Sequence, residues 1–209
     1  GTINNPFKTI TWALARILAD EQHPVTLHLS SGTYSPETGE TFPIILTDYI
    51  SLSGENQNET ILDAQYSNRV LSIINSNNNK IKKITIQHGF TSGHNLPSGA
   101  GIYIKGSNPI ISYVNIIECE ADNANFANGV LYSLGSEPIL NQIYVANNIG
   151  PGVRVDFSNI SITNSIIENN SFRGIFIDLS DLYIANTKIS NNDSSGLVVF
   201  ESFGTVQNS

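Results

Sequence analysis

Hydrophobic and polar positions alternate along most of this chain, and the alternation recurs with a fixed period between residues 152 and 195. Residues 152–173 and 174–195 are two copies of equal length, and a third copy begins at Gly196. A repeat of roughly twenty residues is typical of a solenoid, in which each turn buries its apolar side against its neighbours. Because alternate residues of a strand point to opposite faces, each copy predicts one turn of a parallel β-helix.

The alternation also predicts which side chains fill the core. In each turn two apolar residues of the first strand point inward, and we expect this of Ile102, Ile104, Val153, Val155, Ile175, Ile177, Leu197 and Val199. Glycines open successive turns at 101, 129, 152, 174 and 196. The longer spacings place insertions before residues 101 and 129. About eight turns would form a rod with a narrow aliphatic core.

Polar residues recur with the same period and predict ladders along the rod. Gln142, Asn164 and Asn186 share one position, and Asn148, Asn170 and Asn192 share another, which Cys119 occupies one turn earlier. Asparagine tolerates left-handed backbone and forms hydrogen-bonded stacks between strands. A buried Cys119 at a turn is therefore a structural residue, with a reactive thiol as the alternative.

One segment has a helical pattern instead. Ile10, Ala13, Leu14 and Ile17 lie on one face of a helix predicted over residues 8–20, with Thr9 as its N-cap. Such a helix would cover the open apolar end of the rod. We therefore predict an all-β chain with one domain, residues 1–209, in which residues 8–20 cap the turns of residues 25–209.

The charge of the chain excludes one class of partner. Charged residues make up 13% of the sequence and the net charge is -8, which argues against a nucleic acid. No apolar run is long enough for a membrane span. The single cysteine rules out an internal disulfide framework. The absence of methionine and the start at Gly1 predict a piece of a longer protein, whose further domains would be partners.

Several short motifs resemble a known family. They are Asn5–Ile10 (NPFKTI), Gly32–Tyr34, Gly39–Ile44, Ser51–Gly54 and Thr60–Ala64. Together they resemble the secreted right-handed parallel β-helix proteins of the pectin-lyase-like superfamily, and in particular bacterial surface proteins with β-helix repeats. The resemblance implies a right-handed β-helix and an extracellular or cell-surface location. It does not imply one activity, because this fold carries lyases, hydrolases, epimerases, adhesins and spacers.

The catalytic motifs of the superfamily are missing from the sequence. Its pectate lyases use an Arg-x-Pro-x-x-Arg pattern with calcium, and none of Arg16, Arg69, Arg154 and Arg173 lies in such a pattern. The polygalacturonase motifs are missing too. The first hypothesis is therefore a structural or adhesive module that binds a polysaccharide or cell-surface glycan. The alternative is a polysaccharide lyase or glycoside hydrolase acting on an acidic polysaccharide.

The repeat itself brings two carboxylates together. Asp156 and Asp178 occupy the same outward position of adjacent turns, which places them about 5 Å apart. Such a pair could bind Ca²⁺ or perform acid–base catalysis, with Arg154 or Lys105 as helper. The alternative is a solvated pair that Arg154 and Lys105 neutralise. No other cofactor is expected.

A second group of candidates lies on the insertions and on the outward face of the first strands. Residues 90–100 and 121–128 should leave the rod at one corner on neighbouring turns, where loops commonly bind ligands. The predicted ligand-binding residues there are Phe90, His94, Asn95, Asp122, Asn123, Asn125 and Phe126. The predicted outward column is Tyr103, Leu131, Arg154, Phe176 and Val198, in which Tyr103 and Phe176 offer ring faces to a sugar. The column could instead contact a neighbouring domain or subunit. Neutral insertions and tolerated exposed apolar residues are the structural alternatives.

Overall fold

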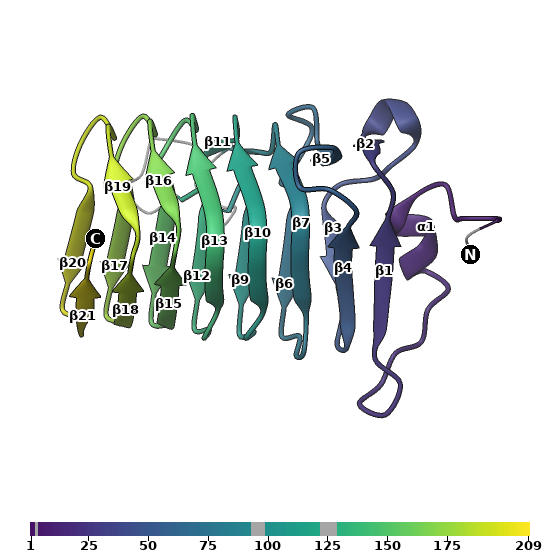
Figure 1. The fold of residues 1–209 in the computed structure, drawn as a ribbon, viewed down its shortest axis with the longest axis horizontal. Coiled ribbons are helices and arrows are strands. Elements are labelled where there is room, and N and C mark those ends of the chain that lie inside the picture. The colour runs from purple at the N-terminus through teal and green to yellow at the C-terminus, as the bar shows by residue number, and fades with distance from the viewer. Residues whose placement is uncertain (3, 93–98, 122–128) are drawn as a thin grey trace.

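The chain forms a parallel β-helix of about seven turns. The computed structural model describes residues 1–2, 4–92, 99–121 and 129–209. The turns stack along the rod with the N-terminal helix at one end (Figure 1). This architecture confirms the predicted fold class, an all-β parallel β-helix. The seven-stranded sheet sets the number of turns, one fewer than the sequence predicted.

Two long parallel sheets form the walls of the rod. Sheet I contains β3 (Ile44–Leu46), β6 (Leu71–Ile74), β9 (Ile102–Lys105), β12 (Leu131–Leu134), β14 (Val153–Asp156), β17 (Ile175–Asp178) and β20 (Leu197–Phe200). Along sheet II run β1 (Val25–Leu29), β4 (Ile50–Gly54), β7 (Lys80–Gln87), β10 (Ile110–Ile117), β13 (Ile139–Ala146), β15 (Asn159–Thr163), β18 (Asp181–Ala185) and β21 (Phe203–Gln207).

Six further strands complete the fold. Sheet II also includes β2 (Gly32–Tyr34), β5 (Thr60–Asp63), β16 (Ile166–Glu168) and β19 (Lys188–Ser190). A separate pair, β8 (Phe90–Thr91) and β11 (Glu120–Ala121), lies where the two insertions leave the rod. In that pair Phe90 is in register with Glu120, so the two insertions begin on neighbouring turns at the same corner.

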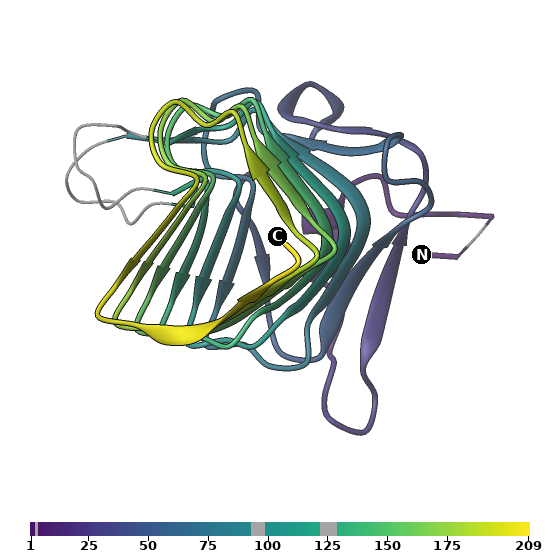
Figure 2. The same ribbon diagram turned by 60° about the vertical axis from the view of Figure 1, so that its left-hand side comes forward.

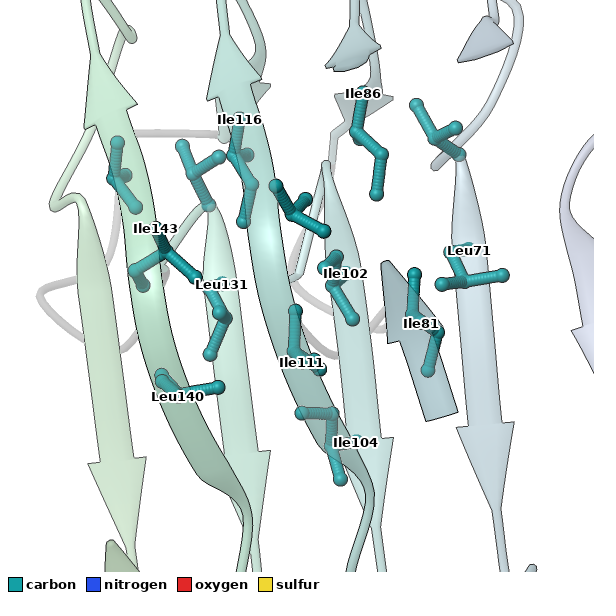
Figure 3. Close-up of a cluster of buried hydrophobic side chains, with 14 of the residues drawn as sticks. Leu71, Ile81, Ile86, Ile102, Ile104, Ile111, Ile116, Leu131, Leu140 and Ile143 are labelled. Carbon is teal, nitrogen blue, oxygen red and sulfur yellow. The ribbon is translucent and has the colours of Figure 1, made fainter. Parts of the chain in front are cut away.

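The core is aliphatic and lies between the sheets. The predicted inward residues Ile102, Ile104, Val153, Val155, Ile175 and Ile177 are all 0% exposed. Figure 3 shows Ile102 and Leu131 of sheet I facing Ile111 and Leu140 of sheet II. Leu197 and Val199 keep the same register in the last turn but are partly or largely exposed.

The register of one turn differs from the prediction. Leu131 pairs with Ile102 and is fully buried, while Tyr132 pairs with both Tyr103 and Arg154. The residue that corresponds to Gly101 is therefore Val130, and the assignment of Gly129 as an opening glycine is wrong. Because a shift of one residue moves every side chain of a strand to the other face, Leu131 belongs to the core. Tyr132 takes its place in the outward column.

The corners combine left-handed backbone with a polar side chain that bonds to the next turn. Gly106, Gly135, Phe157 and Leu179 have φ between 46° and 56°, and each precedes a serine. In this serine ladder a backbone amide donates to the serine of the following turn, as Ser136 N does to Ser158 Oγ at 3.1 Å. This serine ladder was not predicted from the sequence.

The predicted asparagine ladder is present. Asn148 Nδ2 donates to Asn170 Oδ1, and Asn170 Nδ2 donates to Asn192 Oδ1, each at 2.9 Å. The backbone amide of Cys119 donates to Asn148 Oδ1 at 2.9 Å, which confirms that Cys119 continues the series. Gln142, Asn164 and Asn186 share left-handed backbone at another corner, with φ between 52° and 54°.

The N-terminal helix is much shorter than predicted. Helix α1 spans Ile10–Leu14, and a single 3₁₀ turn follows later at Pro36–Thr38. The Thr9 hydroxyl accepts the amide of Trp12 at 3.2 Å, which confirms the N-cap. The prediction of a helix over residues 8–20 is wrong, because Ile17 packs against the core from chain that has left the helix. Tertiary packing rather than helical periodicity decides where short helices end.

Candidate functional site

The outward side of sheet I carries a network centred on Asp156. Arg154 and Asp156 alternate with the buried Val153 and Val155 on β14, so both project away from the core. Arg154 Nε donates to Asp156 Oδ1 at 2.6 Å. The Tyr132 hydroxyl donates to Asp156 Oδ2 at 2.8 Å. Both oxygens of Asp156 are therefore bonded within the protein.

Asp178 is held much less firmly than Asp156. The two aspartates are in register on β14 and β17, as the repeat predicted. Arg154 Nη2 lies 3.5 Å from Asp178 Oδ2, at the limit of a hydrogen bond. Among the described residues Asp178 Oδ1 is buried and has no hydrogen-bond partner. The pair thus consists of one fully engaged carboxylate and one whose bonding capacity is mostly unused.

Aromatic rings and guanidinium groups stack along the same face. Tyr103 and Tyr132 are stacked with their ring centroids 5.8 Å apart. The Arg69 guanidinium lies 4.7 Å from the centre of the Tyr103 ring. Those of Arg154 and Arg173 lie 4.0 and 4.5 Å from the centre of the Phe176 ring. The strands β9, β12, β14 and β17 lie side by side in sheet I (Figure 2). Because Tyr103, Tyr132, Arg154 and Phe176 are in register on them, these groups follow one another along one side of the rod.

Burial shifts the pKa values of the tyrosine and arginine side chains on this surface. Desolvation raises the pKa of Tyr132, and its hydrogen bond to Asp156 adds to the rise. Desolvation also raises the pKa of Tyr103 and lowers that of Arg69. The pKa of Arg173 is lowered by desolvation and then by the nearby charge of Arg154. Tyr132 therefore remains a hydrogen-bond donor to Asp156 at neutral pH.

The structure brings together only some of the predicted site residues. Asp156, Asp178, Arg154, Tyr103 and Phe176 share the outward side of sheet I. Lys105 lies in the column of Asp156, separated from it by Leu134, and is exposed. Phe90 lies at the corner in β8. The residues His94, Asn95, Asp122, Asn123, Asn125 and Phe126 lie outside the described residues.

Sequence reasoning missed Tyr132 and Arg69 at this site. The spacing of the corner serines would have given the correct register for Tyr132. Ser107 and Ser136 are 29 residues apart in the sequence, which is also the separation of the paired residues Ile102 and Leu131. Arg69 stacks from the corner before β6, where no repeat period places it. In the part of the chain that the structure describes, no group of three or more His, Cys, Asp or Glu residues could hold a metal ion.

Comparison with known families covers nearly the whole chain. Residues 1–208 match the sequence profile of a family described as protein of unknown function (DUF1565). The chain belongs to this family. A search of curated proteins found no match. No helix among the described residues is long and apolar enough to cross a membrane.

Solved structures with a similar course of the chain include three carbohydrate-acting proteins. A pectin methylesterase from Yersinia enterocolitica is 13% identical with a TM-score of 0.44, and 97% of this chain and 94% of that chain are covered. The mannuronan C-5 epimerase AlgE4 A-module of Azotobacter vinelandii is 13% identical with a TM-score of 0.47, covering 95% and 71%. Carrot pectin methylesterase is 13% identical with a TM-score of 0.45, and 96% of this chain and 80% of that chain are covered. The likeness is confined to the course of the chain.

Proposed function

We propose that this family member is a carbohydrate-binding β-helix module of an extracellular or cell-surface protein, and that an acidic polysaccharide binds along the outward side of sheet I. The observation that supports this is the placement of arginine. Three of the four arginines of the chain, Arg69, Arg154 and Arg173, stack on aromatic rings of this one surface. They lie there although the chain has a net charge of -8.

The local charge suits an anionic ligand. Among the described residues the surface has four cations, the three arginines and Lys105, against the carboxylates Asp156 and Asp178. Guanidinium groups bind carboxylates through two parallel hydrogen bonds. Phe176 and Arg173 are partly exposed, and the Arg173 guanidinium lies over the Phe176 ring. A uronate residue could direct its carboxylate to this stacked guanidinium group.

Binding measurements with matched arginine variants test this proposal. We expect calorimetry to detect binding of polygalacturonate or alginate oligosaccharides, but not of neutral dextran, and the affinity should fall as salt is added. Arg173→Gln should weaken binding about 10-fold. Arg16→Gln changes an arginine that stacks on Trp12 at the N-terminal end, so it should leave binding unchanged. Equal binding of dextran and the uronates would contradict the proposal.

A polysaccharide lyase or glycoside hydrolase is the second candidate function. The underused carboxylate of Asp178 next to Arg154 favours it, since an acid–base catalyst needs a carboxyl group that the protein has not already engaged. Lys105 would help from the same column. Incubation with acidic polysaccharides would reveal turnover as unsaturated or reducing ends. Turnover that Asp178→Asn abolishes would replace the module hypothesis, while binding without turnover would exclude the enzyme.

Calcium is a further alternative at the aspartate pair. A bridging Ca²⁺ would have to displace Arg154 and Tyr132, because both oxygens of Asp156 are already bonded. We therefore propose that binding needs no calcium. Adding either EDTA or calcium should leave the affinity for the oligosaccharides unchanged. A loss of affinity in EDTA that calcium restores would identify the pair as a metal site instead.

Assembly through the last turn is also proposed. There Val199 and Val206 keep the inward register of the core but are 43% and 48% exposed. Apolar strand edges of this kind favour stacking on another copy or on a further domain. Light scattering should show self-association of this chain that a longer chain with additional downstream sequence lacks. A strictly monomeric chain would contradict end-to-end stacking.

A further inference from the structure

The unequal bonding of the aspartate pair points to a specificity residue within the proposed site. We infer that the carboxylate of Asp178 accepts a hydrogen bond from a free hydroxyl group of the bound sugar. The inference rests on the proposed carbohydrate binding and names the ligand more closely. The preferred sugar unit is a uronate that presents an unmodified hydroxyl group close to its carboxylate.

The bonding state of each oxygen supports this role. Among the described residues, Asp156 has partners at 2.6 and 2.8 Å, whereas the side chain of Asp178 has one contact at 3.5 Å and one oxygen without a partner. An unsatisfied buried acceptor is destabilising, and a bound donor would remove that cost. Arg154 contacts both aspartates, but its short hydrogen bond is to Asp156. The donor for Asp178 therefore has to come from outside the network.

A ligand bound at Phe176 and Arg173 can reach Asp178. The side chain of Asp178 is 25% exposed, compared with 10% for that of Asp156. Phe176 and Asp178 are alternate residues of β17 and project to the same side, about 7 Å apart. The terminal torsion of aspartate is soft, so a small turn of the carboxylate brings Oδ1 towards the solvent side. A sugar ring that lies against the stacked side chains of Phe176 and Arg173 thus has Asp178 within reach of its hydroxyl groups.

This arrangement predicts how the site discriminates between glycans. A binding site whose buried acceptor bonds to a ligand hydroxyl discriminates against ligands in which that hydroxyl is blocked, because the protein acceptor is then left unpaired. Acetylation of the sugar hydroxyls removes the donor and leaves the uronate charge intact. The arginine contacts would be retained while the contact with Asp178 is lost.

The test compares hexamers of galacturonate and mannuronate with the same hexamers after O-acetylation. We expect the wild type to bind at least one parent hexamer about 10- to 100-fold more tightly than its acetylated form. In Asp178→Asn the carboxylate charge is lost at constant size, and the preference should fall below about 3-fold. Asp181→Asn is the matched control, since Asp181 is an exposed aspartate on β18, around the corner in sheet II. That variant should keep the full preference.

The possible outcomes separate this inference from the proposed function. Failure of both parent hexamers to bind contradicts the proposed function and the inference together. Tight binding of the parent and acetylated hexamers alike, with Asp178→Asn unchanged, overturns the role of Asp178 and leaves carbohydrate binding in place. Circular dichroism and thermal melting of Asp178→Asn exclude misfolding, which we do not expect because Arg154 keeps Asp156 as its partner.

Discussion

The carboxylate of Glu40 accepts the backbone amide of Ile10 at 2.5 Å across a sequence separation of 30. It also accepts the amide of Thr11 at 2.9 Å, and Glu40 is only 4% exposed. The first amides of a helix have no partner within the helix, so this distant side chain satisfies two of them. The start of α1 is therefore bonded to the chain that leads into β3.

Glu40→Ala should release the N-terminal cap. Loss of the carboxylate leaves the amides of Ile10 and Thr11 unpaired, and we expect a cost of about 2 to 3 kcal/mol. The loss should be local, because solenoids transmit stability mainly between neighbouring turns. Hydrogen exchange should show faster exchange at Ile10 and Thr11 and unchanged exchange in sheet I near β14. Glu37→Ala, in the exposed 3₁₀ turn, is the control; equal effects of the two variants would contradict this role of Glu40.

Replacement of Gly135 by alanine should be destabilising through the backbone alone. Gly135 has φ 56°, and a Cβ added there would meet no atom within 4 Å. Left-handed backbone costs a non-glycine residue about 1 kcal/mol. At the same corner Leu179 has φ 46°, so Leu179→Gly should be neutral or stabilising by about 0.5 kcal/mol. Urea unfolding should show a loss of stability for Gly135→Ala and no loss for Leu179→Gly. A loss of stability in Leu179→Gly would show that packing rather than backbone conformation dominates at this corner.

Asn170→Ala should be among the most damaging single substitutions. Asn170 is 0% exposed, and its side chain bonds to Asn148, Asn192 and the carbonyl oxygens of Val145 and Glu168. Its removal leaves several buried groups unpaired, so we expect a loss of about 3 kcal/mol or more.

Asn192→Ala is the comparison for this ladder. Asn192 has the same position in the next turn but is only partly buried. It should cost less than half as much in denaturant unfolding. Similar losses for both variants would show that the ladder gains little from burial.

Alkaline pH should destabilise the fold through Cys119. Burial raises the pKa of the Cys119 thiol from its ordinary 9.0 to about 12. Between these values the unfolded chain has released the proton and the folded chain has kept it, so stability falls as pH rises, by at most about 1.4 kcal/mol per unit. Below pH 9 the effect vanishes.

Thiol labelling and the Cys119→Ser variant test this pH dependence. At pH 8 the native thiol should resist iodoacetamide and react fully in denaturant, since only the thiolate reacts. Cys119→Ser should lose less stability than the wild type between pH 9 and 10.5. Rapid labelling of the native protein at pH 8 would show that the thiol is not buried in solution.

The sequence predicted the repeat, the core residues and the pairing of Asp156 with Asp178, because period and alternation follow directly from strand geometry. It placed β12 wrongly because glycine served as the marker of each turn, and Val130 occupies that position after the insertion. Glycine is required only where left-handed backbone or close approach demands it. The corner serines, which bond to the next turn, would have been the better marker.

The bonding within the candidate site could not be predicted. Whether Arg154 bonds to Asp156 or to Asp178 depends on side-chain rotamers and on the position of Tyr132. The wrong register had placed the Tyr132 side chain on the core side of its strand. The predicted length of the N-terminal helix was wrong for a similar reason, because Ile17 reaches the core without helical backbone. Local periodicity contains no information about either choice.

The serine and asparagine ladders also determine how such a protein can change in length. Each turn offers the next one the same acceptors at the same corners, as Asn148 meets Asn170 and Asn170 meets Asn192. A turn inserted or removed as a whole would leave every remaining hydrogen bond with a partner of the same kind. Duplication of a single repeat could thus lengthen the rod without redesign of the core, and the number of turns can vary independently of the surface that binds a ligand.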